Sequence, residues 1–204
     1  MMLALPRSFY QRPATDVAPD LLGKLLVRQT ELGLRIGRIV EVEAYLGRED
    51  LAAHSSKGVT PRTQVMFGEA GHAYVYLIYG MHHCMNVVTG PAGSGSAVLL
   101  RALEPVQGLA LATNGPGRLT RAMEIDKQFY GADLCRPDST LYLADDGPHP
   151  PAEILTSPRI GVDYAGAWAA APLRYYLAES AWVSGRPAAR SRARNRADKT
   201  FSKN

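Results

Sequence analysis

The chain has 204 residues, of which 46% are hydrophobic and 21% charged, and its formal net charge is +4. This length and composition predict a single domain around one sizeable core. No uncharged apolar stretch reaches about 18 residues, and no basic segment precedes the short apolar run at the N-terminus. We therefore expect neither a membrane span nor a secretory signal, and a cytoplasmic location.

The positive charge is concentrated at the C-terminus. Residues 186–204 hold seven basic residues against Asp198, a net charge of +6, which leaves −2 for the rest of the chain. We therefore expect a domain over residues 1–185 and a basic tail over residues 186–204. Two interpretations of the tail stay open, because the segment lacks apolar periodicity: a solvated terminus, or an electrostatic arm that binds a polyanion.

The first part of the sequence predicts a helix and two strands. The helix is expected at residues 15–22, with Thr15 or Asp16 as its N-cap. A strand should follow at residues 24–29, and a longer one at residues 34–45.

Alternation gives the longer strand two unlike faces. Glu41, Glu43 and Tyr45 share one parity, and the other parity holds apolar residues: Ile36, Val40, Val42 and Ala44. Because successive side chains of a strand point to opposite sides, the first three should project together. Ile39 interrupts the alternation without removing it. We interpret the face with the two carboxylates as a candidate working surface.

The middle of the chain predicts a loop and a β-hairpin. Residues 47–61 are polar and bounded by glycine and proline, which is typical of a loop with at most one helical turn. Two runs rich in Val, Ile, Tyr and Met, at residues 72–78 and 83–89, flank Gly80 and predict a tight antiparallel pair. A further strand is expected at residues 96–103.

The second half predicts shorter elements. Helices are expected at residues 105–112 and 117–125, the second after an NGPG turn whose glycines allow backbone to approach an anion. Residues 133–158 should be rich in loops. Three short extended segments are expected near the end: 159–162, 173–176 and 182–183. Strands without regular βαβ alternation predict an α+β fold with a mostly antiparallel sheet.

The sequence gives little support for metal-dependent or thiol-dependent chemistry. No HExxH or CxxC motif occurs, and adjacent residues of the run His82, His83, Cys84 would point to opposite faces of a strand, so we expect no metal site. Cys84 lies in an apolar strand, where a buried thiol stays protonated and inert. We expect Cys84 and Cys135 to be free thiols.

Glu43 has two interpretations. A carboxylate among apolar strand residues costs desolvation free energy unless it is paired or used. It either forms a salt bridge with an arginine such as Arg101, or acts as a general base that deprotonates water. The residues alone leave both open.

Five motifs resemble a known family. The chain contains, in this order, EVEAYLGREDLAAHS, TPRTQVMF, YVYLIYGMHHCMN, VLLRALEP and NGPGRLTRAM. Over most of residues 7–183 it resembles the alkyladenine (3-methyladenine) DNA glycosylase family of the mammalian type. The resemblance implies a single domain with a curved, mostly antiparallel sheet, a protruding β-hairpin, and surrounding helices and long loops. It also implies a monofunctional base-excision-repair enzyme without cofactor or metal.

The resemblance assigns the chemistry to Glu43 and Arg101. Glu43 would activate the water that attacks the anomeric carbon of the sugar, and Arg101 would help to hold that water and the local charge. The N-glycosidic bond of a damaged purine would be hydrolysed, leaving an abasic site. A single carboxylate suits this reaction because an alkylated purine is already cationic and leaves readily.

The resemblance also implies a pocket for a flipped base. Tyr45, His54 and Tyr76 would enclose the base by stacking, with a hydrogen bond at His54. Asn86 would exclude bases that carry a purine amino group. From the residues alone, Tyr74 and Tyr76 could be core, His54 could cap a loop and Asn86 could satisfy backbone.

Four further residues are expected to contact DNA. Tyr79, at the hairpin tip, would wedge into the helix where the nucleotide has left, which repays part of an unstacking cost of about a few kcal/mol. Met81 lies beside it at the same tip. Arg62 and Arg118 are candidate phosphate contacts.

One departure from the family pattern concerns His82 and His83, because aromatic residues usually follow YGM there. The expected partner is double-stranded DNA with damaged purines, bound by a monomer in the cytoplasm, at the nucleoid of a bacterium or in the nucleus of a eukaryote. Two rival functions stay open: a non-catalytic damaged-DNA-binding module, and a metal-dependent hydrolase that uses the histidines and Glu43.

Overall fold

The computed structural model describes residues 2–147 and 152–185, so the predicted basic tail lies outside the described residues. The strands are β1 (Leu25–Thr30), β2 (Gly33–Tyr45), β3 (Ala73–Ile78), β4 (His82–Thr89), β5 (Ser96–Gln107), β6 (Leu141–Ala144), β7 (Ile154–Ser157) and β8 (Arg174–Leu177). The α-helices are α1 (Arg7–Tyr10), α2 (Ala14–Leu21) and α3 (Pro116–Ala122). The 3-10 helices are η1 (His54–Lys57), η2 (Gln64–Phe67), η3 (Lys127–Phe129) and η4 (Asp163–Ala170).

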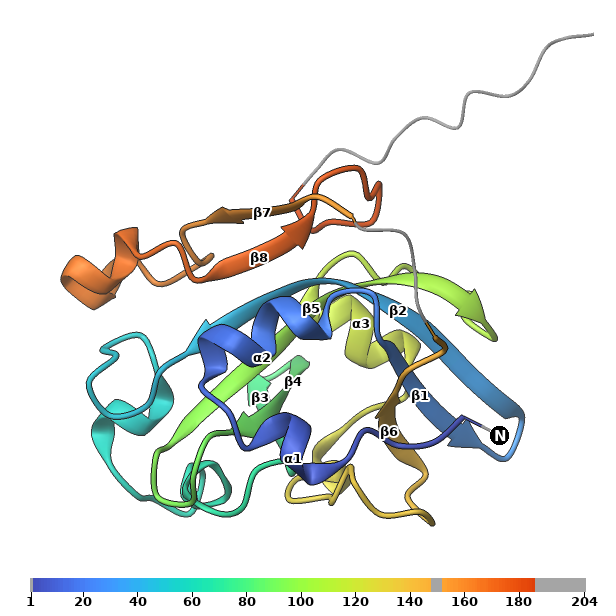
Figure 1. Cartoon of the computed structure of the whole chain (residues 1–204), viewed down its shortest axis with the longest axis horizontal. Helices are drawn as coiled ribbons and strands as arrows, with labels where there is room; N and C mark the ends of the chain where they lie inside the picture. Colours follow the sequence, from blue (N-terminus) through green and yellow to red (C-terminus); the bar gives the residue numbers. More distant parts are fainter. Residues whose placement is uncertain (1, 148–151, 186–204) are drawn as a thin grey trace, which may run out of the picture.

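The strands form one curved antiparallel sheet (Figure 1). Its main path runs in the order β3, β4, β5, β2, β1, β6, and β8 joins β2 and β7 beside this path. The expected α+β fold with a mostly antiparallel sheet is confirmed. No helix among the described residues is long and apolar enough to cross a membrane.

The central strand β2 carries both carboxylates of the candidate surface. It pairs with β5 on one side, and with β1 and then β8 on the other. A register shift between Ile39 and Glu41 marks a β-bulge. Because of this bulge, Ile39 rather than the expected Val40 joins Val42 in the principal core.

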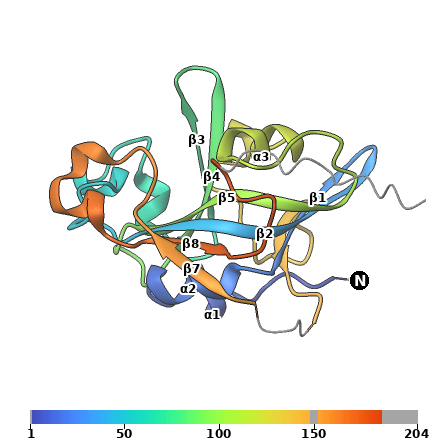
Figure 2. The same cartoon turned by 90° about the horizontal axis from the view of Figure 1, so that it is seen from above.

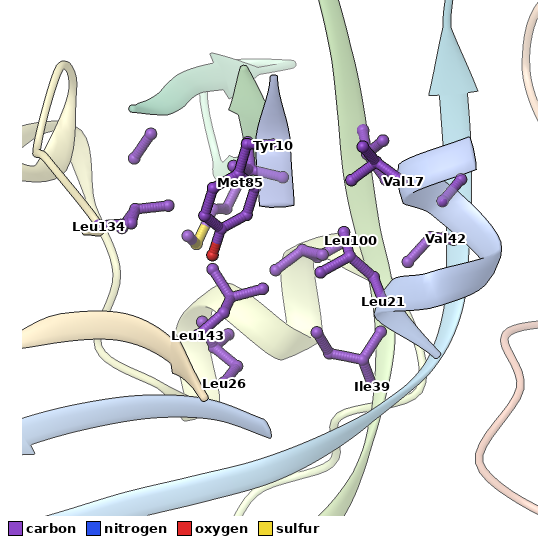
Figure 3. Close-up of a cluster of buried hydrophobic side chains, with 14 of the residues drawn as sticks. Tyr10, Val17, Leu21, Leu26, Ile39, Val42, Met85, Leu100, Leu134 and Leu143 are labelled. Atoms are coloured by element: carbon purple, nitrogen blue, oxygen red, sulfur yellow. The ribbon is translucent and has the colours of Figure 1, made fainter. Parts of the chain in front are cut away.

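The principal core lies between the sheet and the N-terminal helices. The helix α2 packs across β2 and β5 (Figure 1). Its Val17 and Leu21 face Val42 and Leu100, all fully buried (Figure 3). The predicted helix at residues 15–22 is confirmed within one residue, but the cap is wrong, because the N-cap is Pro13 and makes no side-chain cap bond.

The hairpin β3–β4 stands out from the body of the molecule, with α3 beside it (Figure 2). Its turn has two central residues with positive φ, Tyr79 at 52° and Gly80 at 67°, and a Met81 N to Ile78 O bond of 3.2 Å. Two positive φ angles are typical of a type I′ hairpin turn. The predicted pair around Gly80 is confirmed, with the tyrosine in a conformation that aromatic residues rarely adopt.

Some expectations for the second half are wrong and others are confirmed. The helix at residues 105–112 is absent, since β5 runs on to Gln107 and Pro105 lies at a register shift, where a sheet tolerates proline. The helix predicted at 117–125 is α3, which ends at Ala122. The loop-rich segment contains β6 and β7. Of the extended segments, 173–176 corresponds to β8, whereas 159–162 and 182–183 form no strand.

Candidate active site

A cavity of about 230 Å³ lies beside the hairpin. It collects six of the ten predicted site residues: Tyr45, His54, Tyr76, Tyr79, Asn86 and Arg101. These come from β2, η1, the hairpin and β5, which the fold brings together from separate parts of the chain. The volume is below the roughly 300–1,000 Å³ of sites for drug-sized ligands, so the cavity suits a single small ring system.

Aromatic side chains form much of the wall. The Tyr76 ring lies 4.6 Å from His54, centroid to centroid, with the ring planes at 70°. Tyr74 packs 5.2 Å from Tyr76. Tyr74 is 1% exposed and belongs to a small core cluster, and its ring also lines the cavity. The core interpretation and the pocket interpretation therefore both hold for this pair.

His54 is held in place by the same tyrosine. Its Nδ1 lies 2.8 Å from the Tyr74 hydroxyl, so Nε2 is the ring nitrogen left to bond a ligand. Burial, followed by the charges of Arg62 and Lys57, lowers the pKa of His54 to about 4. The imidazole is therefore neutral at pH 7, and can offer only one ring proton.

Asn86 has a structural partner and still lines the cavity. The side chain is 4% exposed, and its Nδ2 donates to the Tyr74 carbonyl at 3.1 Å. This bond fixes which way the amide faces.

Glu43 is fully buried behind the cavity wall. Its Oε2 accepts a bond from the Tyr45 hydroxyl at 2.9 Å, and its Oε1 accepts one from the Ile160 N–H at 2.8 Å. Arg101 Nη1 lies 3.2 Å from the same Oε1. A carboxylate offers about four lone-pair sites, so these three contacts leave one site on Oε2 for a further donor such as water.

The salt-bridge interpretation of Glu43 thus holds, and it does not exclude catalysis. Tyr45 and Ile160, which bond to Glu43, both line the cavity. Burial, first of all, raises the pKa of Tyr45 well above its ordinary value, so its hydroxyl stays protonated and donates. Glu43 is consequently one hydrogen bond away from two residues that line the cavity.

A second buried carboxylate anchors Arg101. Glu41 receives Arg101 Nε at 2.9 Å and Arg174 Nε at 2.7 Å. Ser184 donates to it through both its backbone N–H, at 2.5 Å, and its hydroxyl, at 2.7 Å. Arg101 Nη2 in turn donates to the Ser184 hydroxyl at 3.3 Å. Glu41 therefore holds the Nε side of the Arg101 guanidinium, whose Nη1 contacts Glu43.

Sequence reasoning missed the role of three of these residues. Glu41 carried a usable signal, since it shares the strand parity of Glu43. Ile160 acts through its backbone N–H, which no side-chain pattern marks, and residues 159–162 were expected to be a strand. Ser184 is brought to Glu41 only by tertiary folding.

The four predicted DNA contacts lie in different surroundings. Tyr79 is 85% and Met81 73% exposed at the hairpin tip. The Arg62 guanidinium lies over the Tyr76 ring, 5.0 Å from its centroid. Arg118 is exposed and donates to Asn114 at 3.0 Å. It lines an open groove of about 790 Å³ together with other residues of α3 and with Arg101 of β5. Because Arg101 also lines the cavity, positive charge continues from the cavity along the surface.

His82 and His83 lie where the hairpin meets α3. A Cβ added at Gly117 would come within 3.0 Å of the His82 Cβ, so the glycine permits this close packing. Both cysteines are free thiols, and burial raises the pKa of Cys84. Among residues 2–147 and 152–185, no group of three or more His, Cys, Asp or Glu side chains could hold a metal ion.

Comparison with known proteins adds to this geometry. The sequence pattern of one family, described as methylpurine-DNA glycosylase, matches residues 8–181. The chain belongs to this family. The resemblance expected from the five motifs is confirmed, and the protein is a DNA repair glycosylase, a hydrolase that acts in base excision.

Similar proteins come from bacteria and an archaeon, and each is named as a candidate 3-methyladenine DNA glycosylase. One from Myxococcus xanthus (strain DK1622) is 55% identical over 185 residues, which cover 90% of this chain and 94% of the relative. One from Legionella pneumophila (strain Lens) is 55% identical over 185 residues, 90% of this chain and 99% of the relative. One from Methanocella arvoryzae is 50% identical over 198 residues.

Proposed function

We propose that this glycosylase flips an alkylated or deaminated purine out of duplex DNA and hydrolyses its N-glycosidic bond with a water activated by Glu43. One observation carries the proposal: an aromatic cavity lies directly in front of the Glu43–Arg101 pair, with the exposed Tyr79 on its rim. Tyr45, His54 and Tyr76 enclose the base, and Asn86 restricts which purines enter. The product is an abasic site.

The water takes the unused lone pair of Glu43 Oε2, next to the Tyr45 hydroxyl. Glu43 accepts a proton from this water as its oxygen attacks the anomeric carbon, and the purine leaves with the bonding electrons. A positioned general base contributes roughly 10²- to 10⁴-fold to such a reaction. Arg101, anchored by Glu41, balances the charge of Glu43 before the proton arrives.

Tyr79 fills the space that the flipped nucleotide leaves, with Met81 beside it. Arg118 and Arg62 carry positive charge toward the DNA backbone. No lysine lines the cavity in the described part of the chain, so the proposed reaction is hydrolytic and leaves the strand intact. We further propose that the enzyme acts as a monomer on cytoplasmic DNA.

The test is a base-excision panel. Duplexes with hypoxanthine, ethenoadenine or a methylated purine are incubated with excess enzyme, and alkali-labile sites are counted over time. We expect base release from at least one lesion, and a loss of about 10²- to 10⁴-fold in single-turnover rate in Glu43→Gln with DNA binding retained. Full activity of Glu43→Gln would contradict the mechanism.

The same panel separates the rival functions. Tight binding of a lesion without any base release would favour a damaged-DNA-binding module. Loss of activity after exhaustive chelation, restored by a divalent metal, would favour a metal-dependent hydrolase. We expect release that chelation leaves unchanged.

We also propose that residues 1–185 form the glycosylase domain and that the basic tail, residues 186–204, adds electrostatic affinity for DNA. Each phosphate contact that is lost reduces the dependence of binding on salt. Removing the tail should therefore flatten the plot of log Kd against log salt concentration. An unchanged slope would assign the DNA contacts to the domain alone.

A further inference from the structure

Two walls of the cavity have an arginine stacked on them. The Arg159 guanidinium lies 4.7 Å from the centroid of the Tyr45 ring, and that of Arg62 lies 5.0 Å from the centroid of Tyr76. Both rings line the cavity, whereas neither arginine is among the residues that line it. Each of these two rings therefore already has a cation over one face, which weakens its attraction for a second, cationic ring.

The carboxylates near the cavity are neutralised within the protein. Asp50 binds Arg159 through both oxygens, at 2.5 and 2.8 Å, and both groups are fully buried. Glu41 and Glu43 are likewise paired with arginines, as described above. The three carboxylates are thus matched by three guanidinium groups: Arg101, Arg159 and Arg174.

Arg62 is left in excess of this balance. No carboxylate within residues 2–147 and 152–185 forms a salt bridge with it. Its charge acts on three cavity walls, since it affects the pKa of His54, Tyr74 and Tyr76. Counted over these four guanidinium groups and three carboxylates, the charge beside the cavity is +1.

The lowered pKa of His54 indicates that its surroundings disfavour a positive charge. It stands in the cavity wall, with its ring centroid 4.6 Å from that of Tyr76. Its pKa falls to about 4, first because of burial and then because of Arg62 and Lys57. A cation placed beside this imidazole would meet the same desolvation and the same repulsion.

We propose, on the basis of the glycosylase function above, that the cavity binds neutral damaged purines in preference to cationic ones. Alkylation at a ring nitrogen that carries no proton gives a cationic purine, whereas deamination or ring closure across an amino group gives a neutral one. The cationic base leaves its sugar readily and gains little from tight binding. The neutral base depends on the pocket for its release.

The test compares two bases of one shape that differ in charge. Duplexes carry 7-methylguanine or its neutral isostere 7-methyl-7-deazaguanine opposite cytosine, each on a 2′-fluoro sugar that prevents base loss. Binding is measured at slightly acidic pH, where 7-methylguanine keeps its N1 proton, and an undamaged duplex gives the baseline. We expect the neutral isostere to bind about tenfold more tightly, the size of one like-charge repulsion across the cavity at an effective dielectric constant of about 20.

Two variants locate the source of this preference. In Arg62→Met both Kd values should rise because a positive charge facing the DNA backbone is lost, and their ratio should fall toward one because the unbalanced charge beside the cavity is gone. In Arg118→Met, a matched change at an exposed arginine outside the cavity, both Kd values should rise and their ratio should persist. Equal Kd values in the wild-type protein, with both duplexes bound above the baseline, would overturn the selectivity alone. Binding of neither base above the baseline would overturn the proposed function as well.

Discussion

The hairpin tip and the carboxylate cluster of β2 lie beside the same cavity and differ in their exposure to water. At the tip, Tyr79 is 85% exposed on a backbone with φ of 52°. In the cluster, Glu41 and Glu43 are fully buried, and each of their oxygens accepts at least one hydrogen bond. The hairpin tip exposes an aromatic ring to water, whereas the carboxylate cluster buries charged groups away from water.

This difference indicates how the two regions contribute to stability and to binding. A ring in water on an unfavourable backbone costs free energy in the isolated protein and is useful only when a partner covers it. A buried charge with several partners is costly to disturb, because removing one partner leaves another uncompensated. Substitutions should therefore destabilise the cluster and leave the tip stable or improve it.

The largest expected effect is that of Glu41→Gln. The change leaves Arg101 and Arg174 sharing one fewer negative charge in a buried site, which typically costs about 3–5 kcal/mol. The free energy of unfolding in urea measures it. Base release by the folded fraction should also slow, because Arg101 loses the anchor that directs it to Glu43.

Glu49→Gln is the matched control for this change. It removes the same charge from an exposed side chain nearby in sequence. Surface substitutions of this kind usually stay within about 0.5 kcal/mol. If Glu41→Gln unfolded at the same urea concentration as Glu49→Gln, the buried charge of Glu41 would not contribute to the free energy of unfolding.

A smaller effect on stability, a gain where Glu41→Gln gives a loss, is expected at the hairpin tip when glycine replaces Tyr79. Tyr79→Gly and Tyr79→Ala both remove the ring, so both should weaken binding to damaged duplex. Only glycine adopts φ of 52° without steric cost, so Tyr79→Gly should be more stable than Tyr79→Ala by about 1 kcal/mol. Thermal unfolding and DNA titration of the two variants separate the backbone from the ring. Equal melting temperatures would show that the turn carries no strain.

The sequence predicted best where a local pattern decides the structure. The hairpin follows from two β-rich runs around Gly80, and the common face of Glu43 and Tyr45 follows from strand parity. The prediction erred at Ile39, where a bulge that depends on the partner strand resets the alternation. Pro105 also misled it, because in place of opening a helix it occupies an irregularity of β5.

The sequence predicted which side chains gather at the cavity, and it did not predict the groups that hold them. Family motifs pointed to residues of β2, η1, the hairpin and β5, which do line or adjoin one cavity. The groups that hold them are a backbone N–H at Ile160, a serine at 184, and the Asp50–Arg159 pair behind Tyr45. These contacts join segments more than 100 residues apart, and no local pattern of residues encodes them.

The effect that is smallest at neutral pH, and that grows as the pH falls, joins the two regions, since His54 bonds to Tyr74 at the base of the hairpin and faces the same cavity. Its pKa is about 4 in the folded protein, against about 6.5 for an unfolded chain. As the pH falls from about 6.5 toward 4, the unfolded state therefore binds a proton that the folded state does not, and stability is lost over that window. His54→Gln cannot titrate, so the difference in unfolding free energy between wild type and variant should be constant above neutral pH and should shift against the wild type below about 6.5. A difference that stays constant down to pH 4 would show that the cavity accepts a protonated imidazole, and with it a positive charge.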